Sequence, residues 1–287
     1  MKEPYLSQQK LEAFIKAAFE EDIGEGDHST LASIPHDKKG KAQVLIKEQG
    51  VIAGLELAAM IFNFFDPDLR VKCLLKDGQV VKKGDIALEV DGRAASILST
   101  ERLMLNCLQR MSGIATKTRH LSQLISHTNA KILDTRKTTP NFRMLEKWAV
   151  SLGGGQNHRF ALYDMIMLKD NHVDFAGGIT KAVIATHAYL LENNLDLKIE
   201  VETRNLEEVR EVLEVGGVDY ILLDNMDFQT LKAAVDIIGG QAKTEASGGI
   251  NEDTIRKVAE CGVDFISVGA LTHHIESMDI SLKAVES

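Results

Sequence analysis

Apolar and polar positions follow two different patterns, which divide the chain near residue 130. In the first part, apolar residues on one face of residues 7–24 predict an amphipathic helix, which Ser7 can cap and Gly24 can end. Residues 41–92 hold short apolar stretches separated by Asp-Gly and Lys-Gly turns, as in antiparallel hairpins. Residues 99–127 predict one or two helices. This part is therefore expected to be a small antiparallel sheet with helices.

In the second part, short apolar strands alternate with helical segments. The expected strands are "KILDT", "MIMLKD", "LKIEVET", "DYILLDN", "AKTEAS" and "DFISVGA", and the expected helices are 180–193, 205–215, 227–238 and 252–261. Strict alternation of strand and helix indicates a parallel sheet. Six or more units in so short a length favour an α/β barrel, with a doubly wound open sheet as the alternative.

Residues that can bind a charged ligand recur just past each expected strand. They are Thr135, Arg136, Lys137, Lys169, Glu202, Asp224, Ser247, Gly248, Gly249, Gly269 and Ala270. In an α/β barrel the carboxyl ends of all strands share one rim, where active sites are built. The pattern therefore predicts that these scattered residues meet at one mouth, and this is the main argument for an enzyme.

Positive charge is concentrated in one segment of an acidic chain. The net charge is −9, yet residues 131–172 hold seven Lys or Arg and four Asp or Glu, so this segment carries +3 and the rest −12. A local cationic pocket attracts an anionic ligand, and the arginine fork suits carboxylate or phosphate. The glycine turns at 247–249 and 268–270 suit phosphate. For Arg143 and Lys147, a solvated helix face is an equally good interpretation.

The bulk composition excludes several classes of partner. A net charge of −9 argues against a nucleic-acid binder. No run is long and apolar enough to cross a membrane, and the first residues lack the apolar core of a signal peptide. The three cysteines form no C-x-x-C pair, which favours a reducing, cytoplasmic compartment. We therefore expect neither nucleic acid nor membrane as a partner.

The acidic strand ends and Lys169 leave alternatives open. Glu202 and Asp224 could hold Mg²⁺ through water, accept hydrogen bonds from sugar hydroxyls, or pair with Lys137 or Lys169. A strand-end lysine could also be a Schiff-base nucleophile. That role needs an apolar pocket, whereas "KDNH" gives Lys169 an acidic neighbour, so a binding role is favoured.

At these residues the chain resembles the quinolinate phosphoribosyltransferases. The segment "DTRKTTPNFRMLEKWAVSLGGGQNHRFALYDMIMLKDNH" carries the resemblance, supported by "EDIGEGDHST", "ERLMLNCLQRMSGIAT", "EVE", "LLDN", "SGGI" and "VGALTH". The resemblance implies an N-terminal open α/β sandwich domain over residues 1–115, to which residues 272–287 return. It implies a C-terminal incomplete α/β barrel over residues 116–271. A related group implicated in molybdenum transport lacks "KDNH", so the presence of this motif favours quinolinate. That group and a non-catalytic carrier are kept as alternatives.

The resemblance also implies a reaction and an assembly. Quinolinate and 5-phosphoribosyl-1-diphosphate would react, with Mg²⁺, to give nicotinate mononucleotide, diphosphate and CO₂, a step of NAD biosynthesis. The minimal unit would be a homodimer with shared active sites, and whether dimers form a hexamer is left open.

The roles implied for single residues follow from their places in these motifs. Arg102 would reach the partner's site. Arg136, His158, Arg159 and Lys169 would bind the two carboxylates of quinolinate. Lys137 would contact the diphosphate or ribose, with Thr135 beside it. Glu202 and Asp224 would hold ribose hydroxyls and the water shell of the metal, with no direct metal ligand. Ser247, Gly248, Gly249, Gly269 and Ala270 would hold phosphate. The residues expected to act in catalysis are Lys137, Lys169, Glu202 and Asp224.

Overall fold

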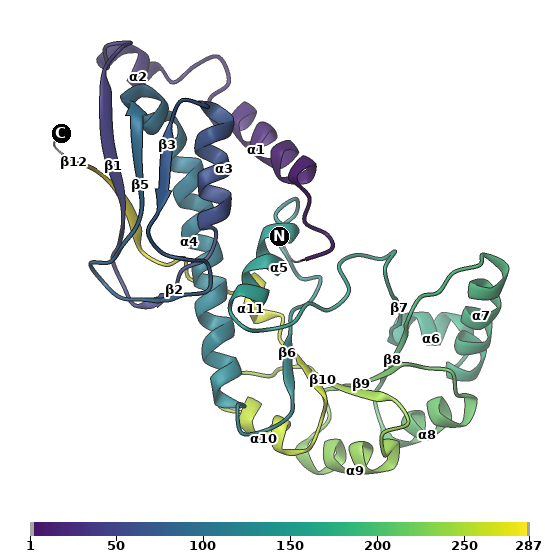
Figure 1. Ribbon diagram of the computed structural model, residues 1–287. Helices are drawn as coiled ribbons and strands as arrows, with labels where there is room; N and C mark the ends of the chain where they lie inside the picture. The colour runs from purple at the N-terminus through teal and green to yellow at the C-terminus, as the bar shows by residue number, and fades with distance from the viewer. Residues whose placement is uncertain (1–2, 286–287) are drawn as a thin grey trace. The chain divides into compact units, whose positions relative to one another are not determined.

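A computed structural model describes residues 3–285 and resolves two compact units (Figure 1). One unit holds the residues up to 119, residues 138–154 and the residues from 271 onward. The other holds residues 120–137 and 155–270. This division differs from the predicted one, which assigned the whole of 138–154 to the barrel domain.

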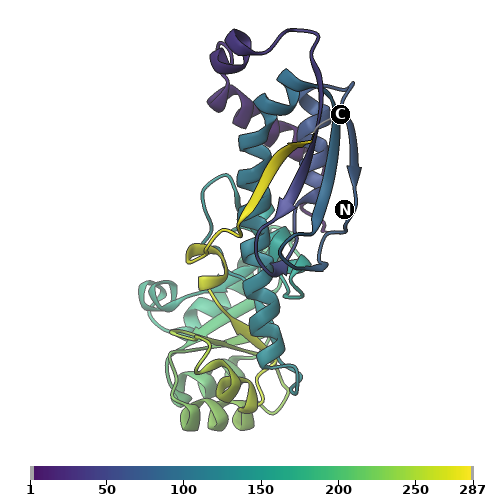
Figure 2. The ribbon, with the colours of Figure 1, turned by 90° about the vertical axis from the view of Figure 1, so that its left-hand side faces the viewer.

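The first unit is built on an antiparallel sheet of four strands in the order β12-β1-β5-β3. The strands are β1 (Lys39–Ile46), β3 (Arg70–Cys73), β5 (Ile86–Arg93) and β12 (Ile280–Val285). Helices α3 (Leu55–Phe65) and α4 (Ala94–Leu124) lie on one face of this sheet, and Figure 2 looks onto its other face. This layered arrangement is the predicted open α/β sandwich.

Local sequence signals account for helix α1 (Gln8–Asp22). The Ser7 side chain accepts a hydrogen bond from the backbone N–H of Lys10, which caps the helix as predicted. Leu11, Ile15 and Phe19, four residues apart, form its buried face. The remaining small elements of this unit are α2 (His28–Ser33), β2 (Gly50–Val51), β4 (Val80–Val81) and α11 (Ala270–His273), the last starting at the unit boundary.

Helix α5 (Arg143–Leu152) belongs to the first unit, where a buried ion pair links it to α4. Arg110 Nη2 on α4 lies 2.6 Å from Glu146 Oε1, and the Glu146 side chain is fully buried. The other Glu146 oxygen accepts the backbone N–H of Thr139 at 3.0 Å. A solvated face is the wrong interpretation for Lys147, which is fully buried, while Arg143 is half-buried. The periodicity of apolar residues gave no sign that Glu146 pairs with Arg110 of α4.

The second unit is an all-parallel sheet with the strand order β6-β11-β10-β9-β8-β7. Its strands are β6 (Lys131–Leu133), β7 (Ile166–Leu168), β8 (Ile199–Thr203), β9 (Tyr220–Asp224), β10 (Lys243–Ser247) and β11 (Phe265–Ser267). Consecutive strands from β7 to β11 are neighbours, and β6 comes round beside β11. A doubly wound sheet would reverse direction instead. Within residues 3–285, β6 and β7 do not pair with each other, so the barrel is incomplete, as predicted.

Helices cover the outer face of this sheet (Figure 1). They are α6 (Asp170–Ala176), α7 (Ile179–Glu192), α8 (Leu206–Val215), α9 (Phe228–Ile238) and α10 (Ile255–Glu260). Strand residues alternate between the faces, so Glu200 and Glu202 share one face of β8. The register pairs Glu202 with Leu222, and Leu222 with Glu245. Glu202 and Glu245 therefore lie on the same, inner face of the sheet.

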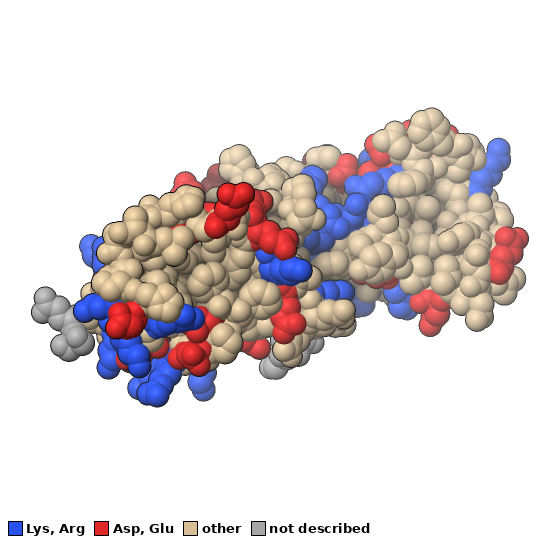
Figure 3. Space-filling view, turned by 90° about the horizontal axis from the view of Figure 1, so that it is seen from above, with Lys and Arg blue, Asp and Glu red and all other residues tan. Residues whose placement is uncertain are grey.

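Charged side chains are mixed on the face of the molecule drawn in Figure 3, where basic and acidic groups lie next to one another. Among residues 3–285, no helix is both long and apolar enough to span a bilayer.

Candidate active site

The predicted site residues of the barrel unit lie at one edge of its sheet. All six strands are parallel, so their carboxyl ends meet at one rim. Lys169 follows β7, Glu202 lies near the end of β8, Asp224 ends β9 and Ser247 ends β10. Gly269 follows β11, and residues 135–137 follow β6. The predicted convergence is confirmed for these residues.

Two arginines form the cationic part of the rim. Arg159 is only 9% exposed, and its Nη1 donates to the carbonyl oxygen of Met165 at 3.1 Å. Burial lowers the pKa of Arg159, and the nearby charge of Arg136 lowers it further. Like charges repel each other, and an anion that contacts both offsets this repulsion. The arrangement therefore suits an anionic ligand.

Lys169 lies beside an acidic strand end. Its Nζ is 3.8 Å from Glu202 Oε2, which is the lysine–carboxylate pairing that the sequence left open. The backbone N–H of Lys169 donates to Nδ1 of His172 at 3.0 Å, so this histidine serves the start of α6. The Lys169 side chain is 46% exposed and ion-paired, unlike the buried, apolar setting that a Schiff-base lysine needs.

The carboxylates of Glu202 and Asp224 lie near each other on the rim. Burial raises the pKa of Glu202; the charge of Lys169 opposes this rise, and the charge of Asp224 adds to it. Asp224 Oδ2 also accepts a hydrogen bond from the side-chain amide of Asn225 at 2.8 Å. Adjacent carboxylate oxygens are suitable groups for sugar hydroxyls or for the water shell of Mg²⁺.

The turn after β10 has a shape that only glycine allows. Gly248 has a φ of 97°, and a Cβ added there would lie 2.2 Å from Oδ1 of Asn225. The Asn225 backbone N–H in turn donates to the carbonyl oxygen of Ser247 at 2.9 Å, which ties this turn to the end of β9. Backbone N–H groups in such a turn can approach a phosphate closely.

The turns after β6 and β11 are also ordered by hydrogen bonds. The Lys137 backbone N–H donates to Oγ1 of Thr135 at 3.0 Å, and the Lys137 side chain is exposed. Val268 N–H donates to the carbonyl oxygen of Leu133 at 3.0 Å, which holds the end of β11 against β6. Gly269 then precedes Ala270, the first residue of α11.

His158 lies below the rim in a network that the sequence did not predict. Its Nε2 is 2.8 Å from Glu200 Oε2 and 3.4 Å from Glu245 Oε2. Its backbone N–H donates to Oδ1 of the buried Asp134 at 3.0 Å. The spacing of Glu200 two residues before Glu202, and of Glu245 two residues before Ser247, is the sequence signal that could have identified the two glutamates.

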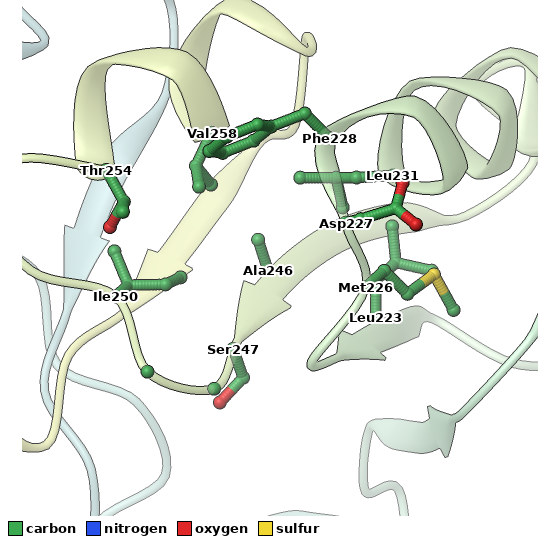
Figure 4. A pocket seen from close by; sticks show the side chains of 12 residues that line it. Leu223, Met226, Asp227, Phe228, Leu231, Ala246, Ser247, Ile250, Thr254 and Val258 are labelled. Carbon is green, nitrogen blue, oxygen red and sulfur yellow. The ribbon is translucent and has the colours of Figure 1, made fainter.

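An apolar pocket lies behind the glycine turn, on the opposite side of the sheet. It has a volume of about 190 Å³ and is lined mainly by residues of β9, α9, β10 and α10, among them Leu223, Phe228 and Val258. In Figure 4, Ala246 points toward this pocket and the Ser247 hydroxyl points away from it. The lining also includes Ser247, Gly248 and Gly249, so the glycine turn forms part of the pocket wall.

Arg102 is the one predicted site residue that belongs to the other unit. It is exposed on α4, in the part of that helix assigned to the first unit. Its expected contact with a partner's site stays a prediction.

Family models match almost the whole chain. Residues 27–112 match the model described as "Quinolinate phosphoribosyl transferase, N-terminal domain", and residues 114–283 match its C-terminal counterpart. The border between the matches lies within α4.

Curated relatives and solved structures agree with these matches. A chloroplastic nicotinate-nucleotide pyrophosphorylase [carboxylating] of Arabidopsis thaliana is 47% identical over 99% of this chain and 85% of its own. A probable enzyme of the same name from Bacillus subtilis is 39% identical over 96% of this chain and 94% of its own. The crystal structure of NadC from Streptococcus pyogenes matches with a TM-score of 0.92 and 38% identity, covering 99% of this chain and all of the other.

Proposed function

The chain belongs to the quinolinate phosphoribosyltransferase family, and from that premise we propose how its residues carry out the family's reaction. The enzyme is a pentosyltransferase of NAD biosynthesis. It transfers the phosphoribosyl group of 5-phosphoribosyl-1-diphosphate to quinolinate with loss of CO₂, which gives nicotinate mononucleotide and diphosphate. The observation that carries the assignment is the match of both domain models in their natural order, one directly after the other.

The two arginines and Lys169 bring together substrates that repel each other. Quinolinate carries two carboxylates, and the sugar donor carries several phosphate charges. We assign the carboxylates to Arg136, Arg159 and Lys169, because planar guanidinium groups donate paired hydrogen bonds to carboxylates. The charges of Arg136 and Arg159 oppose each other, and a bound dianion offsets part of that repulsion.

The other side of the rim holds the sugar donor. The Ser247, Gly248 and Gly249 turn, with Gly269 and Ala270, offers backbone N–H groups to phosphate, and Lys137 offers its ammonium group. Glu202 and Asp224 accept hydrogen bonds from ribose hydroxyls. Holding the pyridine nitrogen against the anomeric carbon removes much of the entropic barrier, an effect that can reach roughly 7–11 kcal/mol.

Catalysis then needs preorganised charge and no covalent nucleophile. Positive charge develops on the ribose ring as diphosphate leaves, and the carboxylates of Glu202 and Asp224 stabilise it. After the new bond forms, the cations around the pyridine ring stabilise the negative charge left when CO₂ departs. Mg²⁺ fits here because hard oxygen donors face the diphosphate side. Glu202 and Asp224 would hold it through water, and it would neutralise diphosphate charge.

A direct assay tests the reaction. Purified protein with quinolinate, 5-phosphoribosyl-1-diphosphate and MgCl₂ should release CO₂ and form nicotinate mononucleotide in equal amounts, and omission of either substrate should abolish both. Borohydride treatment with a carbonyl substrate should leave no adduct on Lys169. A folded sample without turnover, or a trapped Lys169 adduct, would contradict the proposal.

The assembly is inferred from the family resemblance, and the location from the spacing of the three cysteines. We propose a homodimer in which Arg102 completes the partner's site, and a cytoplasmic location.

A further inference from the structure

Three titratable side chains from three separate segments meet below the rim. His158 comes from the loop before β7, Glu200 from β8 and Glu245 from β10. Their ligating atoms all lie within 4.8 Å of one another. Exposure of the three side chains is 8%, 0% and 2%, respectively. Such a cluster is too buried for its charges to be screened by water.

The cluster is stable only if its charges compensate one another. Two buried carboxylates in contact repel, and a buried unpaired charge is strongly unfavourable. Burial on its own would lower the pKa of His158, but the hydrogen bonds and charges of Glu200 and Glu245 outweigh it and raise the pKa to about 10. Burial and the charge of Glu245 raise the pKa of Glu200. At neutral pH the histidine is therefore an imidazolium held between the two glutamates.

Glu200 also compensates the charge of one rim cation, Arg159. The charge of Glu200 opposes the lowering of the Arg159 pKa that burial and Arg136 cause. Asp164 acts on Arg159 in the same direction as Glu200. A further carboxylate, Asp134, is fully buried and accepts from the His158 N–H and, at 2.6 Å, from the Asn157 side chain. Carboxylates buried below the rim stabilise the cations without meeting the ligand.

We propose that Glu200 and Glu245 form a buried brace that fixes the His158 ring, with Glu200 also balancing the charge of Arg159, which makes both glutamates positioning residues for quinolinate. This role rests on the proposed function, since quinolinate is the ligand that the cations hold. The brace reaches the dicarboxylate-binding groups through Arg159, on which the charge of Glu200 acts.

The brace predicts different effects on the two substrates. Glu200→Gln and Glu245→Gln keep the side-chain shape and remove the charge. Each should raise the KM for quinolinate by roughly ten- to hundredfold, as expected when a buried cation loses a charged contact. The KM for 5-phosphoribosyl-1-diphosphate should change less than about threefold. Glu245→Asp, which keeps the charge, should retain part of the affinity for quinolinate.

A matched control separates positioning from stability. Glu146→Gln changes another buried, cation-paired carboxylate, but in the first unit. This variant should lower the thermal midpoint and leave the ratio of the two KM values unchanged. Equal increases in both KM values for Glu200→Gln, or lost stability with unchanged KM values, would overturn the proposal.

A spectroscopic measurement tests the brace without any assay. In ¹⁵N-labelled protein, the His158 ring signals should be those of an imidazolium at pH 8, should titrate near pH 10, and should become neutral at pH 8 in the double Gln variant. A neutral His158 ring in the wild type, or one metal ion bound per chain at the three residues, would overturn the brace. Absence of turnover with a charged His158 ring would instead count against the proposed function only.

Discussion

At the scale of single residues, the site is a balance between clustered cations and buried carboxylates. Arg136 and Arg159 lie close enough for one charge to lower the pKa of the other guanidinium. Below them, Glu200 and Glu245 hold His158 through contacts of 2.8 and 3.4 Å. Arg159 and His158 are therefore stabilised by carboxylates below the rim, so we expect that mutations can separate binding strength from fold stability.

Arg136→Ala should reduce binding of quinolinate far more than it reduces stability. The loss of a guanidinium fork should raise the KM for quinolinate by about a hundredfold. The thermal midpoint should change by only about 2 °C, because removal of one charge relieves repulsion of Arg159. Steady-state kinetics and thermal unfolding give the two numbers. Arg210→Ala, an exposed position on α8, is the control and should change neither. A large fall in thermal midpoint with unchanged KM would show that Arg136 is structural.

At the scale of elements, the connections between strands and helices set the shape of the rim. The turn after β10 approaches the end of β9 so closely that a Cβ on Gly248 would be 2.2 Å from Asn225 Oδ1 and 2.9 Å from its backbone nitrogen. Gly249 also has a positive φ, of 59°, but a Cβ there would meet no atom within 4 Å. These neighbouring glycines therefore differ in packing while both lie in the left-handed region.

Gly248→Ala should impair binding of the sugar donor much more than Gly249→Ala. Both changes carry the left-handed penalty of roughly 1–2 kcal/mol, but only the first forces Asn225 to move. We expect Gly248→Ala to raise the KM for 5-phosphoribosyl-1-diphosphate by at least about tenfold and to lower the thermal midpoint further than Gly249→Ala does. Equal effects of the two changes would mean that close packing of this turn is unimportant.

At the scale of the whole molecule, the chain passes between its two units several times. The C-terminal strand β12 pairs with β1 of the first unit, for example Leu282 with Val44. The segment 138–154 also belongs to that unit, although residues on both sides of it belong to the barrel. The role of Arg102 also belongs to this scale, because the family resemblance implies that it reaches the partner's site, which stays a prediction.

Mixed dimers test whether active sites are shared. Arg102→Ala and Lys169→Ala variants should each be inactive, and their mixture should recover up to about a quarter of wild-type activity after subunit exchange, from dimers with one intact site. A mixture of Arg136→Ala with Lys169→Ala is the control. Both residues lie on the same rim, so every site in a mixed dimer stays damaged. Equal recovery in both mixtures, or none in the first after exchange is verified, would contradict a shared site.

The sequence by itself determined the elements and the rim. Apolar periodicity gave α1 and the strand–helix alternation; residues 180–193 were expected to be helical, for instance, and α7 spans Ile179–Glu192. Residues that can bind a charged ligand follow the expected strands. Because parallel strands bring their carboxyl ends to one edge, the sequence indicated that these residues lie on one rim. These features depend on the local pattern of residues along the chain, which can be read without knowing any tertiary contact.

Only the tertiary structure decided which charged groups are buried and what they contact. Lys147 is fully buried although its spacing from Arg143 suited a surface, and α5 joins the first unit through Arg110 and Glu146. Glu200 and Glu245 look like ordinary strand residues until His158 is placed between them. The physical reason is that burial and pairing of charges arise from residues far apart in the chain, and short-range periodicity carries no information about them.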